Sequence, residues 1–188
     1  MHVAKKGLRV LGIAESYSGR EHSTLAGIVM RKDLRIDGAA FSQVTVGGTD
    51  ATGAVVRIVD CLSRRDINLV MISGSVIAWF NIIDPEAVAA ATGLPAIAVT
   101  YEASEGIEED IRHHFPGDEG RLLAYQRLGE RIPVRLRTGH EIYIRPHGIG
   151  ESDAARLCDD FTLDGKVPEP LRVARLVARG AMRSGMGG

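Results

Sequence analysis

The chain has 188 residues, and its 23 basic and 24 acidic side chains leave a formal charge of −1. A chain of this length fits one ordinary domain with a sizeable core, and its 45% apolar and 25% charged residues match the average of globular proteins. Intrinsic disorder, a fibrous repeat and a small disulfide-stapled fold are therefore excluded.

The first part of the chain predicts three strands. Arg9–Ala14 is a short apolar run of the kind found in strands buried on both faces. Leu25–Met30 and Ile36–Val46 follow, and the polar turn between them has the length of a hairpin connection. We therefore expect the first three strands to be antiparallel.

From residue 51 the pattern alternates between helices and strands. Apolar residues at helical spacing predict a helix from Ala51, with Asp50 or Thr52 as its cap. A second helix begins at Asp84-Pro85-Glu86 and ends before Gly93. Further strands are predicted over 69–72, 96–101, 134–137 and 142–145, and further helices over 104–114, 120–128, 151–160 and 170–183.

This order predicts an α/β fold with a mixed five-stranded sheet flanked by helices and a small extra hairpin. The fourth and fifth strands would join the sheet in parallel through right-handed crossovers. A ribonuclease H-like sheet, with the first strand central and the fourth beside it, has this layout. We expect one domain over residues 1–183 and a frayed tail over 184–188.

Cysteine usage and hydropathy indicate the compartment. Cys61 and Cys158 stand far apart, outside any metal-binding spacing, so we expect two free thiols in an intracellular protein. The N-terminus lacks the pattern of a signal peptide. The most apolar stretch, Leu69–Ile83, is too short and too polar to span a bilayer. A cytoplasmic protein without membrane contact is the expectation.

Charge is distributed unevenly along the chain. Residues 121–188 hold 12 basic and 8 acidic residues, and 19 of the 23 basic residues in the chain are arginine. Arginine binds phosphate with a planar fork of donors. The basic C-terminal part is therefore either a contact surface for phosphates or a solvated helix face.

Three segments together resemble endonuclease V. Gly93-Leu-Pro-Ala-Ile-Ala-Val99 resembles the Gly-x-Pro-x-Ile-Gly-Val strand of that family. Ile142-Tyr-Ile-Arg-Pro-His-Gly148 is similar to its Tyr-Val-Ser-Pro-Gly-His loop, and Lys166-Val-Pro-Glu-Pro-Leu-Arg172 to its Arg-Leu-Pro-Glu-Pro-Thr-Arg signature. The resemblance implies a ribonuclease H-like fold in which acids at neighbouring strand ends hold two Mg²⁺ for phosphodiester hydrolysis.

A second resemblance is closer and covers nearly the whole chain. The chain is similar to the domain of unknown function ninety-nine, a family related to endonuclease V. The matching segments are Arg9–Ile13, Thr45–Thr52, Phe80–Asp84 and Pro168–Arg172.

The catalytic residues implied by the resemblance are replaced in this chain. Ala14 stands where the first strand of such enzymes ends in a metal-binding aspartate, and Ser73 stands where the fourth strand ends in a second one. The expected histidine falls on Arg175, and the expected lysine falls near Tyr101. A serine hydroxyl is a poor Mg²⁺ ligand, and arginine does not exchange protons near neutral pH.

Two acids remain candidates for a catalytic role. Asp50 occupies the place of a carboxylate upstream of the fourth strand, and it is either a remnant of the site or a helix cap. Glu15 follows Ala14, but successive strand residues point to opposite faces, so only a β-bulge would turn it toward the site.

Two functions remain open at this stage. The first is a catalytically silent relative of endonuclease V, without cofactor or metal, that binds DNA, RNA or a protein partner. The second is a Mg²⁺-dependent endonuclease with a rearranged site of Asp50, Glu15 and Asp84. Nucleic-acid contacts are expected from the segments resembling endonuclease V, at Arg145, His147, Lys166, Arg172 and Arg175. The oligomeric state is left open by the sequence.

Overall fold

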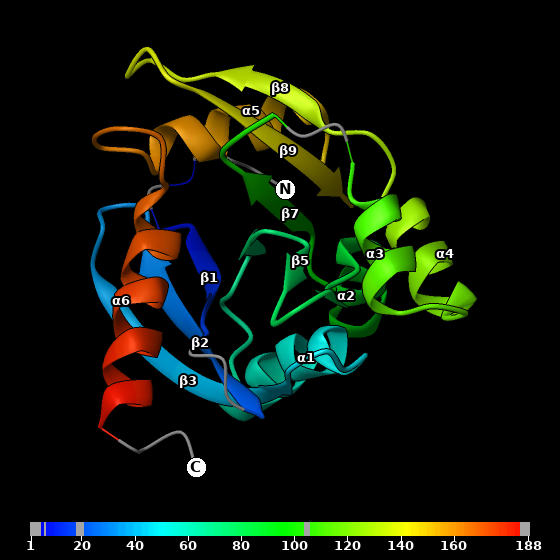
Figure 1. Cartoon of the computed structure of the whole chain (residues 1–188). Helices are drawn as coiled ribbons and strands as arrows, with labels where there is room; N and C mark the ends of the chain where they lie inside the picture. Colours follow the sequence, from blue (N-terminus) through cyan, green and yellow to red (C-terminus); the bar gives the residue numbers. More distant parts are fainter. Residues whose placement is uncertain (1–4, 6, 18–20, 104–105, 185–188) are drawn as a thin grey trace.

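The computed structural model describes residues 5, 7–17, 21–103 and 106–184. A seven-stranded mixed sheet forms the centre, in the order β3-β2-β1-β4-β7-β9-β8, and helices cover its two faces (Figure 1). The strands of this sheet are β1 (Arg9–Ser16), β2 (His22–Arg31), β3 (Ile36–Thr45), β4 (Leu69–Ser73), β7 (Ala96–Thr100), β8 (Ile132–Arg135) and β9 (Glu141–His147). The helices are α1 (Ala51–Leu62), α2 (Pro85–Thr92), α3 (Glu108–His114), α4 (Glu119–Arg127), α5 (Glu151–Asp160) and α6 (Glu169–Arg183).

The strand order confirms the predicted layout around β1. β1 pairs antiparallel with β2 and parallel with β4, where Ile13 lies opposite Ile72. Side chains alternate along β1, so Leu11 and Ile13 join the core beneath α1, whereas Gly12 faces Pro170 at the start of α6. This double burial explains why β1 reads as a continuous apolar run.

The predicted end signals of α2 are confirmed. The Asp84 side chain accepts hydrogen bonds from the backbone N–H groups of Glu86 (2.9 Å) and Ala87 (3.2 Å), and Pro85 occupies the first turn. Gly93 closes the helix in the left-handed conformation, with φ of 67°. Residues 104 and 105 of the helix predicted over 104–114, and the tail residues 185–188, lie outside the described residues.

The predicted extra hairpin belongs to the central sheet. β9 pairs antiparallel with β7, with Ile144 opposite Val99, and β8 forms the edge. Ile142 and Ile144 are fully buried with Val99 in the core beneath α5. Without β9 this edge of β7 would expose apolar side chains and unpaired backbone groups, so the sheet has seven strands where the sequence predicted five.

A small hairpin after β4 was not predicted. Its strands, β5 (Val76–Ile77) and β6 (Asn81–Ile82), are joined by Ala78, Trp79 and Phe80, whose φ values of 41°, 59° and 62° are all left-handed. Residues of these types rarely adopt that conformation. The N–H of Gly47 donates to the carbonyl of Ala78 (2.7 Å) and the buried Arg121 donates to that of Phe80 (2.6 Å). Tertiary contacts therefore hold a turn that the sequence does not signal.

Within the described residues, none of the helices has the length and apolar character needed to cross a bilayer. Both cysteines are free, as predicted; Cys61 is exposed, and burial raises the pKa of the Cys158 thiol to about 12.

Candidate functional site

Ser73, Tyr101 and Arg175 meet at the ends of β4 and β7, and we call them the Ser73 site. Arg175, on α6, donates a hydrogen bond from its terminal guanidinium nitrogen to the Ser73 hydroxyl (2.8 Å). The Tyr101 hydroxyl lies 3.3 Å from the same oxygen, and the Arg175 guanidinium lies 5.7 Å from the centre of the Tyr101 ring. Three positions that the motifs singled out are thus in one place, although 102 residues separate Ser73 from Arg175.

An open pocket of about 350 Å³ contains the Ser73 site. It is lined by Ser73, Gly74, Val99, Thr100, Tyr101, Glu102, Arg131 and Arg175. Burial raises the pKa of Tyr101, although its hydrogen bond with Ser73 and the charge of Arg175 act in the opposite direction. At neutral pH Ser73 and Tyr101 therefore present two neutral hydroxyl groups beside the positive charge of Arg175, and Glu102 and Arg131 add one charge of each sign to the pocket lining.

Ala14 lies on the strand next to Ser73 but not in this pocket. The register of β1 with β4 confirms that their ends are neighbours. Ala14 is only 1% exposed and packs against Ile28 and Ala174 beneath α6. Ala14 therefore does not line a cleft together with Ser73, because α6 covers the end of β1.

Glu15 faces away from the Ser73 site. Its pairing with Leu25 continues the regular antiparallel register of β1 and β2, so a bulge does not redirect the side chain. The Glu15 carboxylate instead accepts a hydrogen bond from the buried Ser23 hydroxyl. The alternation of side chains predicted from the sequence holds here.

Asp50 is fixed by a local hydrogen-bond network. Its carboxylate accepts from the Thr45 backbone N–H (3.1 Å), the Thr45 hydroxyl (2.9 Å) and the Asn81 side-chain amide (2.7 Å). Burial alone would raise the pKa of Asp50, but these hydrogen bonds lower it overall. Asp50 holds the N-cap position of α1, but its side chain does not accept a hydrogen bond from the first turn of the helix. The Asn81 side-chain oxygen accepts a hydrogen bond from the Ala51 N–H instead (3.0 Å).

The residues present do not fit a two-metal centre. Asp84 caps α2, and Glu15 lies on the opposite face of the sheet from Ala14. The Asp50 carboxylate already accepts hydrogen bonds from Thr45 and Asn81. Among the described residues, no three or more histidine, cysteine, aspartate or glutamate side chains are grouped so that they could hold a metal ion. Proteins usually hold Mg²⁺ through at least one carboxylate, whereas Ser73 offers a neutral hydroxyl already bound to the cation of Arg175.

The other residues predicted to contact nucleic acid lie in different surroundings. Lys166 donates to the Tyr101 carbonyl (3.0 Å) and lies 3.6 Å from a Glu102 carboxylate oxygen. Arg172 forms an ion pair with Glu169. His147 is half-buried at the end of β9, and Arg145 faces a separate pocket beside α4.

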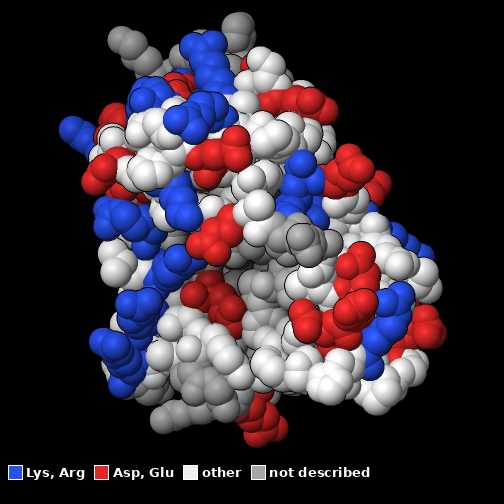
Figure 2. Space-filling view, turned by 45° about the horizontal axis from the view of Figure 1, so that its top comes forward, with Lys and Arg blue, Asp and Glu red and all other residues white. Residues whose placement is uncertain are grey.

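One face of α6 carries a row of exposed arginines. Arg172, Arg175, Arg179 and Arg183 recur every three or four residues, which places them on one side of the helix, and we call them the basic row. Figure 2 shows blue side chains running down the left of the molecule, where α6 lies in Figure 1, and red side chains gathered on the right over α3. Arg179 and Arg183 were not among the predicted contact residues, although their spacing from Arg175 is visible in the sequence.

Comparison with known proteins places the chain among archaeal relatives. Residues 6–182 match the profile of a family described as endonuclease dU. A UPF0215 protein of Pyrobaculum calidifontis is 41% identical over 172 residues, which is 90% of this chain and 94% of that protein. A UPF0215 protein of Thermococcus kodakarensis is 31% identical over 189 residues, covering 95% of this chain and 94% of that protein.

Solved structures share the fold. A protein of unknown function from Archaeoglobus fulgidus superposes with a TM-score of 0.80 and 27% identity, covering 92% of this chain and 97% of that one. Human ENDOV gives a TM-score of 0.65 at 18% identity, over 96% and 87% of the two chains. Endonuclease V of Ciona intestinalis, in complex with inosine-containing DNA, gives 0.64 at 14% identity, over 95% and 87%. The predicted endonuclease V-like fold is confirmed, while the narrower resemblance to the domain of unknown function ninety-nine stays a prediction.

Proposed function

The chain belongs to the endonuclease dU family, and from this premise we propose that it binds nucleic acid on an endonuclease V-like fold without metal-dependent hydrolysis. The observation that carries the proposal is the hydrogen bond from Arg175 to the Ser73 hydroxyl (2.8 Å). A cation is thus bound to the serine that stands where the resemblance to endonuclease V implies a metal-binding carboxylate.

Charge explains why hydrolysis is not expected. Cleavage by two metal ions needs anionic ligands that hold both dications while they activate water and stabilise the leaving oxygen. At the neighbouring ends of β1 and β4, Ala14 and Ser73 stand where the resemblance to endonuclease V implies two carboxylates, and Arg175 adds a positive charge beside Ser73. A dication placed there would be repelled by the guanidinium and would find no anionic oxygen from Ala14 or Ser73.

The same positive charge favours binding of a phosphate backbone. The basic row continues from Arg175 along α6, and Arg131 lines the pocket of the Ser73 site. Arginine forms charge-assisted hydrogen bonds with phosphate oxygens. Binding through such contacts is weak, largely independent of sequence and strongly dependent on salt. A strand lying along α6 would pass the Ser73 site.

A cleavage assay tests the absence of hydrolysis. The purified protein is incubated with Mg²⁺ or Mn²⁺ and with DNA containing deoxyuridine, to which the family description refers, or inosine, which the DNA bound to Ciona endonuclease V contains. We expect product formation at the rate of the buffer control. Metal-dependent cleavage that Asp50→Ala abolishes would overturn the proposal in favour of an endonuclease with a rearranged site.

A binding assay tests the second half of the proposal. Fluorescence anisotropy with labelled single- and double-stranded oligonucleotides should give a dissociation constant that weakens steeply between about 50 and 200 mM salt. A dissociation constant that does not change over this salt range, or the absence of binding at low salt, would exclude nucleic acid as the partner.

A further inference from the structure

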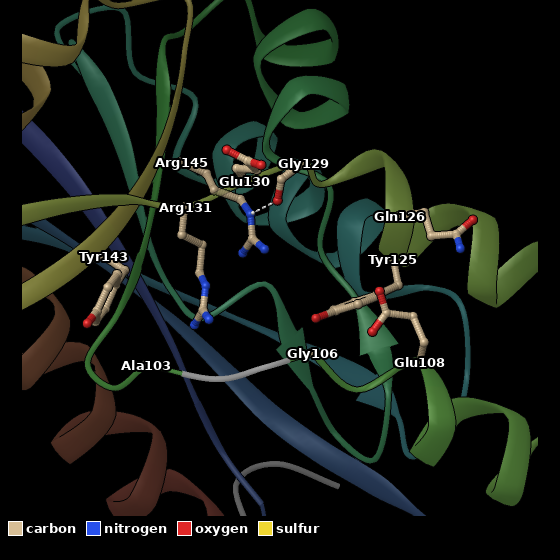
Figure 3. A pocket seen from close by; sticks show the side chains of 10 residues that line it. All are labelled: Ala103, Gly106, Glu108, Tyr125, Gln126, Gly129, Glu130, Arg131, Tyr143 and Arg145. Atoms are coloured by element: carbon tan, nitrogen blue, oxygen red, sulfur yellow. Dashed lines mark hydrogen bonds between the residues drawn. The ribbon is translucent and has the colours of Figure 1, made fainter.

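A second pocket lies beside the Ser73 site, between β9 and the helices α3 and α4. Its volume is about 670 Å³, and we call it the Arg145 pocket. Its lining includes Arg145, Arg131, Tyr125, Tyr143, Gln126 and Glu108. Figure 3 shows the guanidinium groups of Arg145 and Arg131 pointing toward its middle, with the Tyr125 hydroxyl directed toward them from the side of α4.

Arg145 is a buried cation without an acidic partner among the described residues. Only 9% of the residue is exposed, and its one hydrogen bond runs from Nε to the Gly129 carbonyl (3.0 Å). No carboxylate oxygen in the described chain lies within ion-pair distance of it, although Glu108 and Glu130 line the pocket. Figure 3 shows the Glu130 carboxylate turned away from the guanidinium groups.

Such a cation is costly to bury in the folded protein. An unpaired charge loses its hydration without gaining an attractive partner. Burial is the main reason why the pKa of Arg145 is lowered, and the nearby positive charge of Arg131 lowers it further. An anion in the pocket would remove both penalties, because the terminal nitrogens that face the pocket are strong donors.

The fold holds the two arginines in place. Alternation along β9 directs Ile142 and Ile144 into the core and Tyr143 and Arg145 to the opposite face. Arg131 precedes β8, donates to the Glu102 carbonyl (3.1 Å) and stacks 5.3 Å from the centre of the Tyr143 ring. Both guanidinium groups are therefore positioned before any ligand binds, which lowers the entropic cost of binding.

We propose that the Arg145 pocket binds a phosphate group of a nucleic-acid strand, held by Arg145 and Arg131 with the Tyr125 hydroxyl as a further donor. This inference rests on the proposed function and extends it. Arg131 lines both the Arg145 pocket and the pocket of the Ser73 site. A strand whose backbone passes Arg175 can therefore place another phosphate in the Arg145 pocket.

The first test measures thermal stability with inorganic phosphate as the probe. At constant ionic strength set with chloride, phosphate at about 100 times its dissociation constant should raise Tm by roughly 5–10 °C. Arg145→Met should lose this response, and in phosphate-free buffer its Tm should equal or exceed that of the wild type, since a buried charge has been removed. The matched control Arg135→Met removes an exposed arginine from neighbouring β8 and should keep the response.

The alternative is a purely structural Arg145 that only supports the Gly129 carbonyl. In that case Arg145→Met would lower Tm in phosphate-free buffer, and phosphate would shift the wild type and the variant equally. That pair of results overturns the inference.

The second test uses single-stranded oligonucleotides and nucleoside monophosphates. Arg145→Met should weaken oligonucleotide binding by about tenfold or more. It should also reduce the slope of log K against log salt concentration by about 0.7. Arg135→Met should leave the affinity nearly unchanged. Equal oligonucleotide binding by wild type and Arg145→Met overturns the inference and leaves the proposed function standing. Binding of phosphate or monophosphates without any oligonucleotide binding overturns the assignment to a strand together with the proposed function.

Discussion

Asp50 is held by hydrogen bonds that connect three separate segments of the chain. Its carboxylate accepts from Thr45 at the end of β3 and from Asn81 in β6, and Asn81 also donates to the Thr45 carbonyl (2.9 Å). A carboxylate saturated in this way supports the loop before α1, so its structural role is complete without a metal ion.

Replacement of Asp50 by alanine should destabilise the fold. Two donors of Thr45 and one of Asn81 lose their acceptor, and we expect the free energy of unfolding at pH 7 to fall by about 1–3 kcal/mol. Because the pKa of Asp50 is lowered in the folded protein, its stabilising effect is present above the unfolded value of 3.8 and is lost as the pH falls through the folded value. Urea unfolding at pH 7 and near pH 3 should therefore show that the difference in free energy of unfolding between the wild type and Asp50→Ala is smaller in acid. A difference that grows in acid would contradict this account of Asp50.

At the scale of elements, α6 connects the core to the candidate site. Its apolar face packs against β1 and β2, its buried residues include Leu171, Ala174 and Ala178, and its exposed face carries the basic row. The helix starts so close to β1 that a Cβ atom on Gly12 would lie 2.5 Å from the Pro170 carbonyl carbon. The position of Arg175 over Ser73 therefore depends on a glycine that is remote from both in the sequence.

Gly12→Ala should separate α6 from β1. The added methyl group has no space, and we expect a loss of about 1–3 kcal/mol in the free energy of unfolding by urea. Gly180→Ala is the matched control, because nothing lies within 4 Å of a Cβ at this exposed α6 position, and better helix propensity should add up to about 1 kcal/mol. Equal stability of the Gly12→Ala variant and the wild type would show that the helix shifts without cost.

The basic row predicts that removing its arginines weakens the salt dependence of nucleic-acid binding. Arg179 and Arg183 are exposed, and neither forms a salt bridge or side-chain hydrogen bond within the described part of the chain. If both contact phosphates, the double variant Arg179→Met/Arg183→Met should reduce the slope of log K against log salt for single strands by about 1.4. An unchanged slope in anisotropy titrations, with Arg135→Met as the control, would place the strand elsewhere.

At the scale of the whole molecule, the chain combines an endonuclease V-like fold with Ala14 and Ser73 at the strand ends where the resemblance implies carboxylates. Related structures superpose over nearly its full length. The strand pairing between β1 and β4 brings Ala14 and Ser73 to neighbouring ends, whatever residues stand there. The fold therefore sets the place, and the side chains set the chemistry.

Divalent cations should leave the stability of the protein unchanged. We expect millimolar Mg²⁺ or Mn²⁺ to shift Tm by less than about 1 °C relative to EDTA, because a ligand stabilises a fold only where it binds. The variant Ala14→Asp/Ser73→Asp/Arg175→His is the positive control and should gain a metal-dependent rise, with circular dichroism to check folding, since Ala14 is buried. A rise in the wild type that Asp50→Ala removes would contradict the absence of a metal site.

Much of the fold followed from the sequence, because local signals and burial acted in the same direction. Apolar runs marked the strands of the sheet, and the Asp84, Pro85 and Gly93 signals marked both ends of α2. The β5–β6 hairpin was missed, since its left-handed turn has neither glycine nor asparagine and depends on contacts from Gly47 and Arg121. The number of strands was also underestimated, because pairing of β9 with β7 is a long-range choice.

The sequence by itself determined which residues stand at the motif positions, and it predicted from the resemblance that Ala14, Ser73 and Arg175 replace two acids and a histidine. Only the tertiary structure decided what these replacements do. The contact between Arg175 and Ser73, the cover of α6 over Ala14 and the isolation of Arg145 in its pocket all join segments distant in the chain. The physical reason is that charge, hydration and hydrogen bonding at a site depend on distances in space, and side-chain distances between remote segments are fixed only when the core packs.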